Sequence, residues 1–269
     1  MSKRRDVLFL DSGVGGLPYC KHFARHNPQY ALCYVADREH FPYGAKSRSA
    51  LVDLLCRLIE QLQQKIEPAL VVLACNTASI SALNELRIRF PEIDFVGTVP
   101  AVRPAILDSR KGKVGVLGTE RTITDDYISK LARETGRNAE IIRLAAPSLV
   151  DFIEYEFIDA PQTIRSETAV RWTNLLREQG VDGIVLGCTH FLFLQNEFRA
   201  AAAPDITVYD SVEGVCHRAE LIVQGKHHAA AVPPLPPVLI VTGDTPLEDS
   251  WRRWAETFGM NAVCLKELS

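Results

Sequence analysis

Short apolar runs alternate with amphipathic helical patterns along most of the chain, and this alternation restricts the fold more than any other feature of the sequence. The apolar runs lie at residues 7–10, 32–35, 70–73, 114–117, 184–186 and 238–241. The clearest helical patterns lie at residues 49–64, 79–89, 124–135 and 166–179. Short, continuous apolar runs are typical of parallel strands that are buried on both faces. The alternation therefore predicts an α/β fold in which helices cover both faces of parallel sheets.

A weak internal repeat indicates two related halves. Residues 70–77 and 183–190 share an apolar run, a small residue, a cysteine and then polar residues, and residues 8–13 are echoed by 114–119. A chain of 269 residues is also long enough for two cores. We predict two pseudo-symmetric α/β domains with the active site in the cleft between them. Their expected ranges are residues 1–98 with 210–269, and residues 99–209.

The C-terminal region contains a well-marked helical pattern. Thr245 and Glu248 have the spacing of a capping box, and an apolar stripe that includes Trp251 and Trp254 follows. We expect both tryptophans to lie in the core. The histidines at residues 227–228 are expected on the surface, without a metal.

Charge and hydropathy exclude several classes of function. The net charge of −3 gives no general attraction to nucleic acid or to an anionic membrane. The apolar stretch at residues 229–241 contains four prolines, which would break a spanning helix. The apolar run at residues 7–10 is too short for a signal peptide. We therefore expect a cytoplasmic protein without nucleic-acid or membrane partners.

The chain has seven scattered cysteines and no Cys-x-x-Cys pair, which argues against a disulfide framework or a structural zinc site and favours reduced thiols. A single buried cysteine is commonly an inert, small apolar residue. Cys75 and Cys188 differ from that pattern because each follows an apolar run and is followed at once by polar residues. Two cysteines in matched settings favour a functional pair.

Several polar residues are expected at the same edges of the sheets. Asp11, Ser12 and Thr119 join the two cysteines at predicted strand C-termini, where open α/β sheets bind ligands. Two thiols on opposite sides of one ligand suit inversion at a carbon that bears a proton, because one thiolate removes the proton and the other thiol delivers one. A free thiol titrates near ~8.5, so neighbouring helix N-termini and donors would have to favour the thiolate. Asp11 and His190 could relay protons or orient the thiols.

Three further features leave functional and structural interpretations open. The Gly-rich turn at residues 11–16 could approach a ligand or bind an anion, or could be only a tight turn; it does not match Gly-x-Gly-x-x-Gly. The Pro-Tyr-Gly turn at residues 42–44 could cover a ligand or be a simple turn. Glu154 could meet an ammonium group, although a lone glutamate in a helical pattern is more commonly solvated.

These motifs together resemble those of the cofactor-independent glutamate racemases of bacterial cell-wall synthesis, and the resemblance covers nearly the whole chain. It rests on residues 11–16, 40–44, 74–78, 118–119 with 122, 187–190 and 241–244. The resemblance implies that Cys75 and Cys188 are the two acid/base residues, with Cys75 acting on the D-isomer and Cys188 on the L-isomer. Asp11 and His190 would assist proton transfer.

The resemblance also implies a substrate-binding set and partners. The implied substrate-binding residues are Ser12, Pro42, Tyr43, Gly44, Asn76, Thr77, Thr119, Thr122, Thr189 and Glu154. The substrate would be glutamate, the product D-glutamate would supply peptidoglycan synthesis, and no pyridoxal phosphate or metal is expected. Family members commonly form homodimers, so a homodimer is expected here.

The sequence departs from the family pattern near two motifs. Residues 145–147 are Ala-Ala-Pro where relatives usually have Ala-Cys-Pro, and Phe191 and Leu192 replace a Tyr-Pro pair. These changes affect local packing more than chemistry. The long N-terminal extension that some relatives use to bind a cell-wall precursor is not seen, so activation of that kind is not expected.

Two alternatives remain open. Aspartate racemases share the two-thiol plan but commonly have Cys-Thr-Glu in the second motif, whereas residues 188–190 here are Cys-Thr-His, which favours glutamate. A non-catalytic amino-acid-binding or redox-sensing protein could also use the thiols as ligands or switches, but the matched polar residues after each cysteine argue against it.

Overall fold

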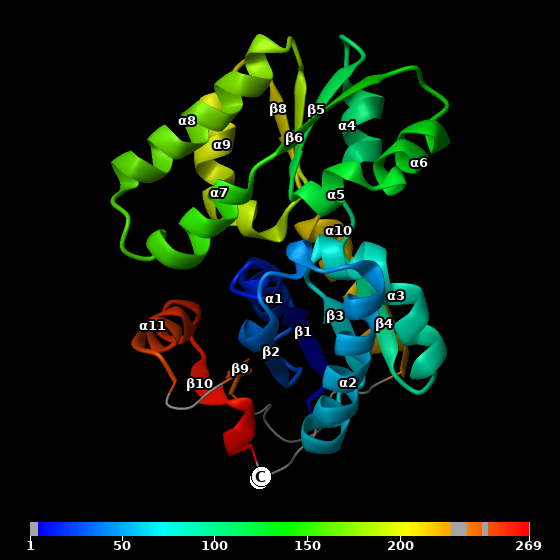
Figure 1. The fold of residues 1–269 in the computed structure, drawn as a ribbon, viewed down its shortest axis with the longest axis vertical. Helices are drawn as coiled ribbons and strands as arrows, with labels where there is room; N and C mark the ends of the chain where they lie inside the picture. Colours follow the sequence, from blue (N-terminus) through cyan, green and yellow to red (C-terminus); the bar gives the residue numbers. More distant parts are fainter. Residues whose placement is uncertain (1–4, 227–235, 244–246, 269) are drawn as a thin grey trace. The chain divides into compact units, whose positions relative to one another are not determined.

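The computed structural model describes residues 5–226, 236–243 and 247–268. The chain divides into two compact units, one formed by Met1–Thr98 with Val212–Ser269 and the other by Val99–Ser211 (Figure 1). The expected histidine pair at residues 227–228 and Thr245 of the expected capping box lie outside the described residues.

The first unit is built on a six-stranded sheet in which all pairings are parallel, in the order β10-β9-β2-β1-β3-β4. Its strands are β1 (Val7–Asp11), β2 (Leu32–Ala36), β3 (Leu70–Leu73), β4 (Asp94–Gly97), β9 (Val238–Val241) and β10 (Asn261–Cys264). Its α-helices are α1 (Leu17–His26), α2 (Arg48–Ile66), α3 (Asn76–Arg89), α10 (Val212–Lys226) and α11 (Asp249–Phe258). Short 3₁₀ turns lie at Arg38–His40, Tyr43–Ala45 and Leu265–Glu267.

Alternate residues of the central strand β1 face two different layers of helices. Leu8 and Leu10 belong to the apolar cluster that includes the buried faces of α2 and α3. Phe9 instead packs on Phe23 of α1, with ring centroids 5.7 Å apart. Because both faces of the strand are covered, all five of its residues are buried, which explains its continuous apolar run.

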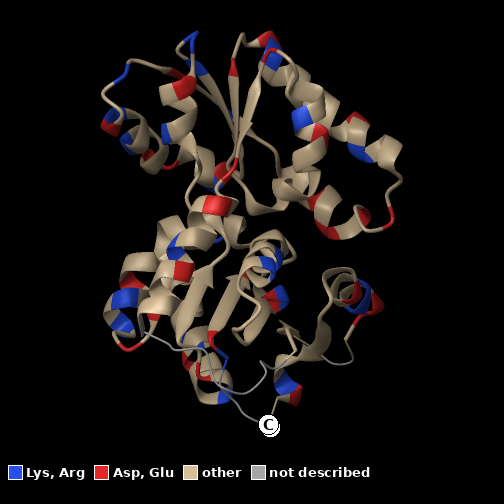
Figure 2. Ribbon diagram, turned by 180° about the vertical axis from the view of Figure 1, so that it is seen from behind, with Lys and Arg blue, Asp and Glu red and all other residues tan. Residues whose placement is uncertain are grey.

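The second unit is built on a four-stranded parallel sheet in the order β6-β5-β7-β8. Its strands are β5 (Lys113–Gly118), β6 (Glu140–Ala145), β7 (Gly183–Leu186) and β8 (Thr207–Tyr209). Its helices are α4 (Val102–Asp108), α5 (Glu120–Thr124), α6 (Asp126–Glu134), α7 (Pro147–Asp151), the π-helix Phe152–Glu156, α8 (Gln162–Glu178), the 3₁₀ helix Thr189–Leu194 and α9 (Gln195–Ala202). Charged residues lie mainly on helices and loops in both units (Figure 2).

The α/β prediction is confirmed, and the strands that the sequence predicts are the interior ones. All six apolar runs correspond to interior strands, whereas β4, β6, β8 and β10 are the edges of their sheets. An edge strand has only one neighbour and is covered less, so it need not carry a continuous apolar run. The edge strand β6 shows this, because none of its residues is fully buried.

Helix boundaries differ from the expected ones for local reasons. Helix α3 begins at Asn76 rather than at residue 79, and the extended Cys75 (φ −142°, ψ 120°) occupies its N-cap position. The pattern at residues 124–135 is interrupted at Asp125, whose carboxylate accepts a hydrogen bond from the Tyr127 N–H at 2.9 Å and starts α6. Trp251 and Trp254 are buried in the core, as expected.

No helix within the described residues is both long and apolar enough to cross a membrane.

Two glycines allow the backbone to approach closely where strands end. A Cβ atom on Gly16 would lie 2.5 Å from the Cβ of Ala74, the residue before Cys75. A Cβ atom on Gly187, the residue before Cys188, would lie 2.9 Å from the carbonyl oxygen of Leu117. The residue before each cysteine, Ala74 or Gly187, thus takes part in a close contact in which the glycine could not carry a larger side chain.

We predict that Gly187→Ala lowers the free energy of unfolding by about 1–3 kcal/mol, because the new methyl group meets backbone that cannot move aside. Urea denaturation measures this change. The matched control is Gly214→Ala in α10, where no atom lies within 4 Å of the new Cβ; it should leave stability unchanged or raise it by about 0.5–1 kcal/mol. Equal stability of the two variants would contradict the close approach at Gly187.

Candidate active site

Cys75 lies two residues beyond the end of β3 and caps the N-terminus of α3. The Ser79 hydroxyl lies 2.8 Å from the Cys75 carbonyl oxygen and accepts a hydrogen bond from the Thr98 N–H at 2.9 Å. These contacts fix the backbone on which the thiol is carried. Asn76 and Thr77 form the first turn of α3 and are buried, so the partial positive charge of the helix N-terminus lies beside the thiol.

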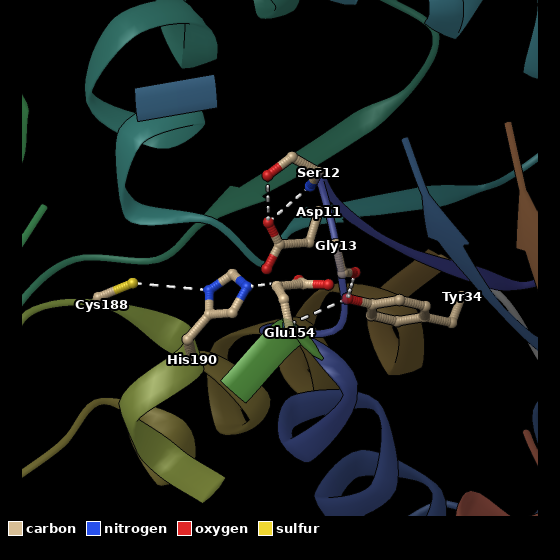
Figure 3. Close-up of polar contacts among 8 residues, drawn as sticks. Asp11, Ser12, Gly13, Tyr34, Glu154, Cys188 and His190 are labelled. Atoms are coloured by element: carbon tan, nitrogen blue, oxygen red, sulfur yellow. Dashed lines mark hydrogen bonds and ion pairs between the residues drawn. The ribbon is translucent and has the colours of Figure 1, made fainter. Parts of the chain in front are cut away.

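Asp11 is the last residue of β1, the strand beside β3. Its side chain is fully buried, and its Oδ1 accepts hydrogen bonds from the Ser12 N–H at 2.6 Å and the Ser12 hydroxyl at 3.4 Å (Figure 3). Leu10 pairs with Leu73 in the parallel strands β1 and β3. Asp11 and Cys75 therefore both lie at the carboxyl-terminal end of the sheet.

The Gly-rich turn after Asp11 is held by a tyrosine that was not predicted to take part. The Tyr34 hydroxyl donates to the Gly13 carbonyl oxygen at 2.7 Å and accepts from the Gly16 N–H at 3.0 Å (Figure 3). Tyr34 lies in β2 and is fully buried. It therefore ties both ends of the turn to the neighbouring strand.

Tyr43 is buried, while Pro42 beside it is exposed. The Tyr43 hydroxyl donates to Oδ2 of Asp37 at 2.7 Å. Burial, the Asp37 charge and hydrogen bond, and the charges of Cys75 and Asp11 together raise the pKa of Tyr43 well above its usual value, so the phenol stays protonated. Tyr43 also belongs to the same apolar cluster as Cys75.

Asp37 is a residue of this region that the sequence analysis missed. Its side chain is fully buried, and it follows β2 directly. Its position in the sequence could have indicated it, because Asp37 directly follows the strand β2, much as Asp11 ends the strand β1.

In the second unit, Cys188 follows β7 and caps the 3₁₀ helix Thr189–Leu194. Its Sγ atom lies 3.6 Å from Nδ1 of His190, and Nε2 of His190 lies 2.7 Å from Oε1 of Glu154 (Figure 3). The side chains of His190 and Glu154 are only 5% and 3% exposed. A thiol, an imidazole and a carboxylate thus form a buried chain of hydrogen-bonding groups.

Of the two interpretations left open for Glu154, the solvated one does not apply, because its side chain is only 3% exposed. It lies in the π-helix Phe152–Glu156, which follows α7 directly. Single π-helical turns within helices are common at functional sites, because the wider turn redirects side chains. The carboxylate is buried against His190 instead of facing water.

The environment of His190 favours its protonated form. Burial alone lowers the pKa of an imidazole, but the hydrogen bonds to Cys188 and Glu154 and the negative charge of both partners outweigh it and raise the pKa of His190 well above its usual value. A raised pKa stabilises the folded state fully below the unfolded pKa of about 6.5. That contribution is lost as the pH rises through the pKa of the folded state.

Three threonines follow strands of the second unit. Thr119 follows β5 and caps α5, and its hydroxyl oxygen accepts from the Thr122 N–H at 3.2 Å. The two hydroxyl oxygens of Thr119 and Thr122 are 3.0 Å apart. Thr189 is buried in the first turn after Cys188. These side chains can offer hydroxyl groups to a ligand's carboxylate.

The predicted site residues fall into two groups, one in each unit. The first unit carries Asp11, Ser12, Pro42, Tyr43, Gly44, Cys75, Asn76 and Thr77, and the second carries Thr119, Thr122, Glu154, Cys188, Thr189 and His190. A cavity of about 390 Å³ in the first unit is separate from both groups, and its lining includes Arg38, Thr242 and Trp251. Within the described residues, no cluster of three or more His, Cys, Asp or Glu residues could hold a metal ion.

The chain is similar to known racemases in sequence and in structure. Residues 20–219 match the model of the Asp/Glu/hydantoin racemase family. Glutamate racemase of Treponema pallidum is 38% identical over 221 residues, which cover 81% of this chain and 82% of that protein.

Two solved structures align with almost the whole chain. Escherichia coli glutamate racemase, in complex with L-glutamate and the activator UDP-MurNAc-Ala, gives a TM-score of 0.82 at 27% identity and covers 97% of each chain. A glutamate racemase isoform of Bacillus anthracis gives a TM-score of 0.79 at 26% identity and covers 98% of each chain.

We predict that Glu154→Gln lowers the pKa of His190, because the substitution removes the negative charge but keeps the side-chain length. NMR titration of the His190 ring measures the pKa directly. Glu156→Gln, at an exposed position of the same π-helix, is the matched control and should leave this pKa unchanged. An unchanged His190 pKa in Glu154→Gln would show that the carboxylate does not support the imidazolium.

Proposed function

We propose that glutamate is the substrate of this chain, which belongs to the Asp/Glu/hydantoin racemase family and is therefore an amino-acid racemase. The observation that carries the proposal is the matched placement of two thiols. Cys75 and Cys188 each follow an interior parallel strand and cap the helix that comes next, and each has an ionisable partner nearby. The relative from Treponema pallidum is named a glutamate racemase, and the Escherichia coli relative binds L-glutamate.

The proposed reaction uses the two cysteines as a pair of bases. A thiolate removes the α-proton of glutamate, and the electron pair of the broken C–H bond moves toward the α-carboxylate. The second cysteine, protonated, delivers its proton to the opposite face of the α-carbon, which gives the other isomer. Cys75 acts on D-glutamate and Cys188 acts on L-glutamate, so the thiol and the thiolate exchange roles in the reverse direction.

The two thiols are supported by different groups. Cys188 contacts His190, whose raised pKa keeps an imidazolium beside the thiolate and supplies a positive charge where negative charge is needed. Cys75 lies at the N-terminus of α3 and at the same sheet edge as the buried carboxylate of Asp11, which can accept the thiol proton. Glu154 acts through His190, which its carboxylate orients.

The remaining predicted residues are suited to binding the polar groups of an amino acid. Ser12, Asn76 and Thr77 are buried at the edge that carries Cys75. Thr119, Thr122 and Thr189 follow strands of the sheet that carries Cys188. We propose that these hydroxyl and amide groups hold the carboxylates and the ammonium group while the thiols act on the α-carbon.

We further propose a cellular role and an assembly. The product D-glutamate would supply peptidoglycan synthesis, as the family resemblance implies. The chain would act as a homodimer, which sedimentation equilibrium tests by the mass in solution. All seven cysteines lie outside any disulfide, and two of them must be thiols for the proposed chemistry. That requirement fits a reducing compartment such as the cytoplasm.

We predict that Cys75→Ala and Cys188→Ala each lower kcat for racemization by about 10²–10⁴-fold or more, because each removes a group that transfers a proton in the transition state. Circular dichroism at fixed wavelength follows the change from L- to D-glutamate. Cys56→Ala, in α2 and only partly buried, is the matched control and should retain activity. Near-normal racemization by either site variant would refute the two-base mechanism.

We predict that the purified protein racemizes L-glutamate with no added cofactor and turns over L-aspartate more slowly. The same assay with each amino acid in turn measures both rates. Turnover of aspartate alone would make the protein an aspartate racemase. Binding of glutamate without turnover would favour a non-catalytic binding protein.

A further inference from the structure

One buried residue, Asp37, contacts three neighbouring segments at the carboxyl-terminal end of the first sheet. Asp37 follows β2, and its side chain is 0% exposed. Its N–H donates to the Asp11 carbonyl oxygen at 2.8 Å, at the end of β1. Its carboxylate binds side chains from the loop after β2 and from the residue after β9.

Three side chains donate to the two oxygens of this carboxylate. The Thr242 hydroxyl donates to Oδ1 at 2.6 Å, and the Tyr43 hydroxyl donates to Oδ2 at 2.7 Å. Nδ1 of His40 lies 2.9 Å from Oδ1 and 3.1 Å from Oδ2. A buried charge is costly unless it is hydrogen-bonded, and all three of these side chains can donate to it. An asparagine at this position would turn an N–H₂ group toward one of these donors.

The Tyr43 side chain leads from this carboxylate to the proposed site. Its ring is 1% exposed and belongs to the same apolar cluster as the Cys75 side chain. The charge of Cys75 acts on its pKa. The Tyr43 ring is thus part of the apolar cluster that contains Cys75, and the hydrogen bond to Asp37 holds the Tyr43 hydroxyl.

We propose that Asp37 is a positioning residue of the racemase reaction, which acts by holding Tyr43 beside Cys75. The proposal rests on the proposed function. The Asp37 side chain is fully buried; it fixes the phenol through Oδ2 and the end of β1 through its N–H. A substitution outside the reacting groups that misplaces them by about 1 Å can lower the rate by about 100-fold.

A double-mutant cycle tests the proposal with Asp37→Asn and Tyr43→Phe. Each single variant should lower kcat/KM for L-glutamate by about 10–100-fold, because the groups around Cys75 would be misplaced. The kcat/KM of the double variant should be no more than about threefold below that of the less active single variant, because both substitutions break the same hydrogen bond. Effects that multiply would show that Asp37 and Tyr43 act independently, and they would overturn the proposal.

Asp182→Asn is the matched control for a merely structural effect. The Asp182 carboxylate also accepts three hydrogen bonds, from Ser109, Arg110 and Lys111, but it lies away from the proposed site. It should lower stability to urea without lowering kcat/KM. A proportional loss of kcat/KM and stability in both aspartate variants would assign Asp37 a structural role only and overturn the proposal.

Tyr43→Phe alone decides the matter if Asp37→Asn does not fold. It keeps the ring and removes only the hydroxyl that donates to Asp37. A folded Tyr43→Phe variant with unchanged kcat/KM would overturn the proposal. If the unsubstituted protein turns over glutamate and the losses in kcat/KM multiply, only the proposed role of Asp37 is refuted. If the unsubstituted protein shows no turnover, the proposed function is refuted as well.

Discussion

The transition from a buried strand to a capped helix is the constraint on which the proposed site depends. Cys75 (φ −142°, ψ 120°) and Cys188 (φ −131°, ψ 137°) are both extended residues that end a strand segment and begin a helix. Each thiol thereby lies between an apolar core and a helix N-terminus, whose partial positive charge favours negative charge nearby. Glycines allow the backbone to come close at both places, since Gly16 meets Ala74 and Gly187 meets Leu117.

Cys75 and Cys188 have similar backbone conformations but different charged neighbours. Cys188 has a buried imidazole and a carboxylate in series, whereas Cys75 shares its surroundings with the buried Asp11 and with a tyrosine held by Asp37. A racemase must act on both isomers of its substrate, so each thiol must be able to lose and to gain a proton. In the proposed mechanism, a cationic group supports Cys188 and an anionic group accepts the proton of Cys75.

Much of the fold could be predicted because the interior strands are covered on both faces and are therefore continuously apolar. The four edge strands could not, since partial exposure allows polar residues and breaks the pattern, as in β6. The two cysteines could be singled out because both follow interior strands. The contact of Glu154 with His190 could not be predicted, because it depends on a π-helical turn that no local pattern marks. Asp37 was missed although it follows a buried strand, because its bonds to His40, Tyr43 and Thr242 form only in the folded structure.

The central claim is that two bases act on opposite faces of one α-carbon, and the early labelling pattern in D₂O tests it most directly. L-Glutamate is incubated with the enzyme for a small fraction of one conversion, and the deuterium content of each isomer is measured by mass spectrometry after chiral separation. The account predicts deuterium at Cα of the D-glutamate formed and almost none in the remaining L-glutamate, because each thiol exchanges its proton with solvent before it serves as the acid. D-Glutamate that retains the original proton, or early labelling of both isomers alike, would contradict the account and indicate a single base.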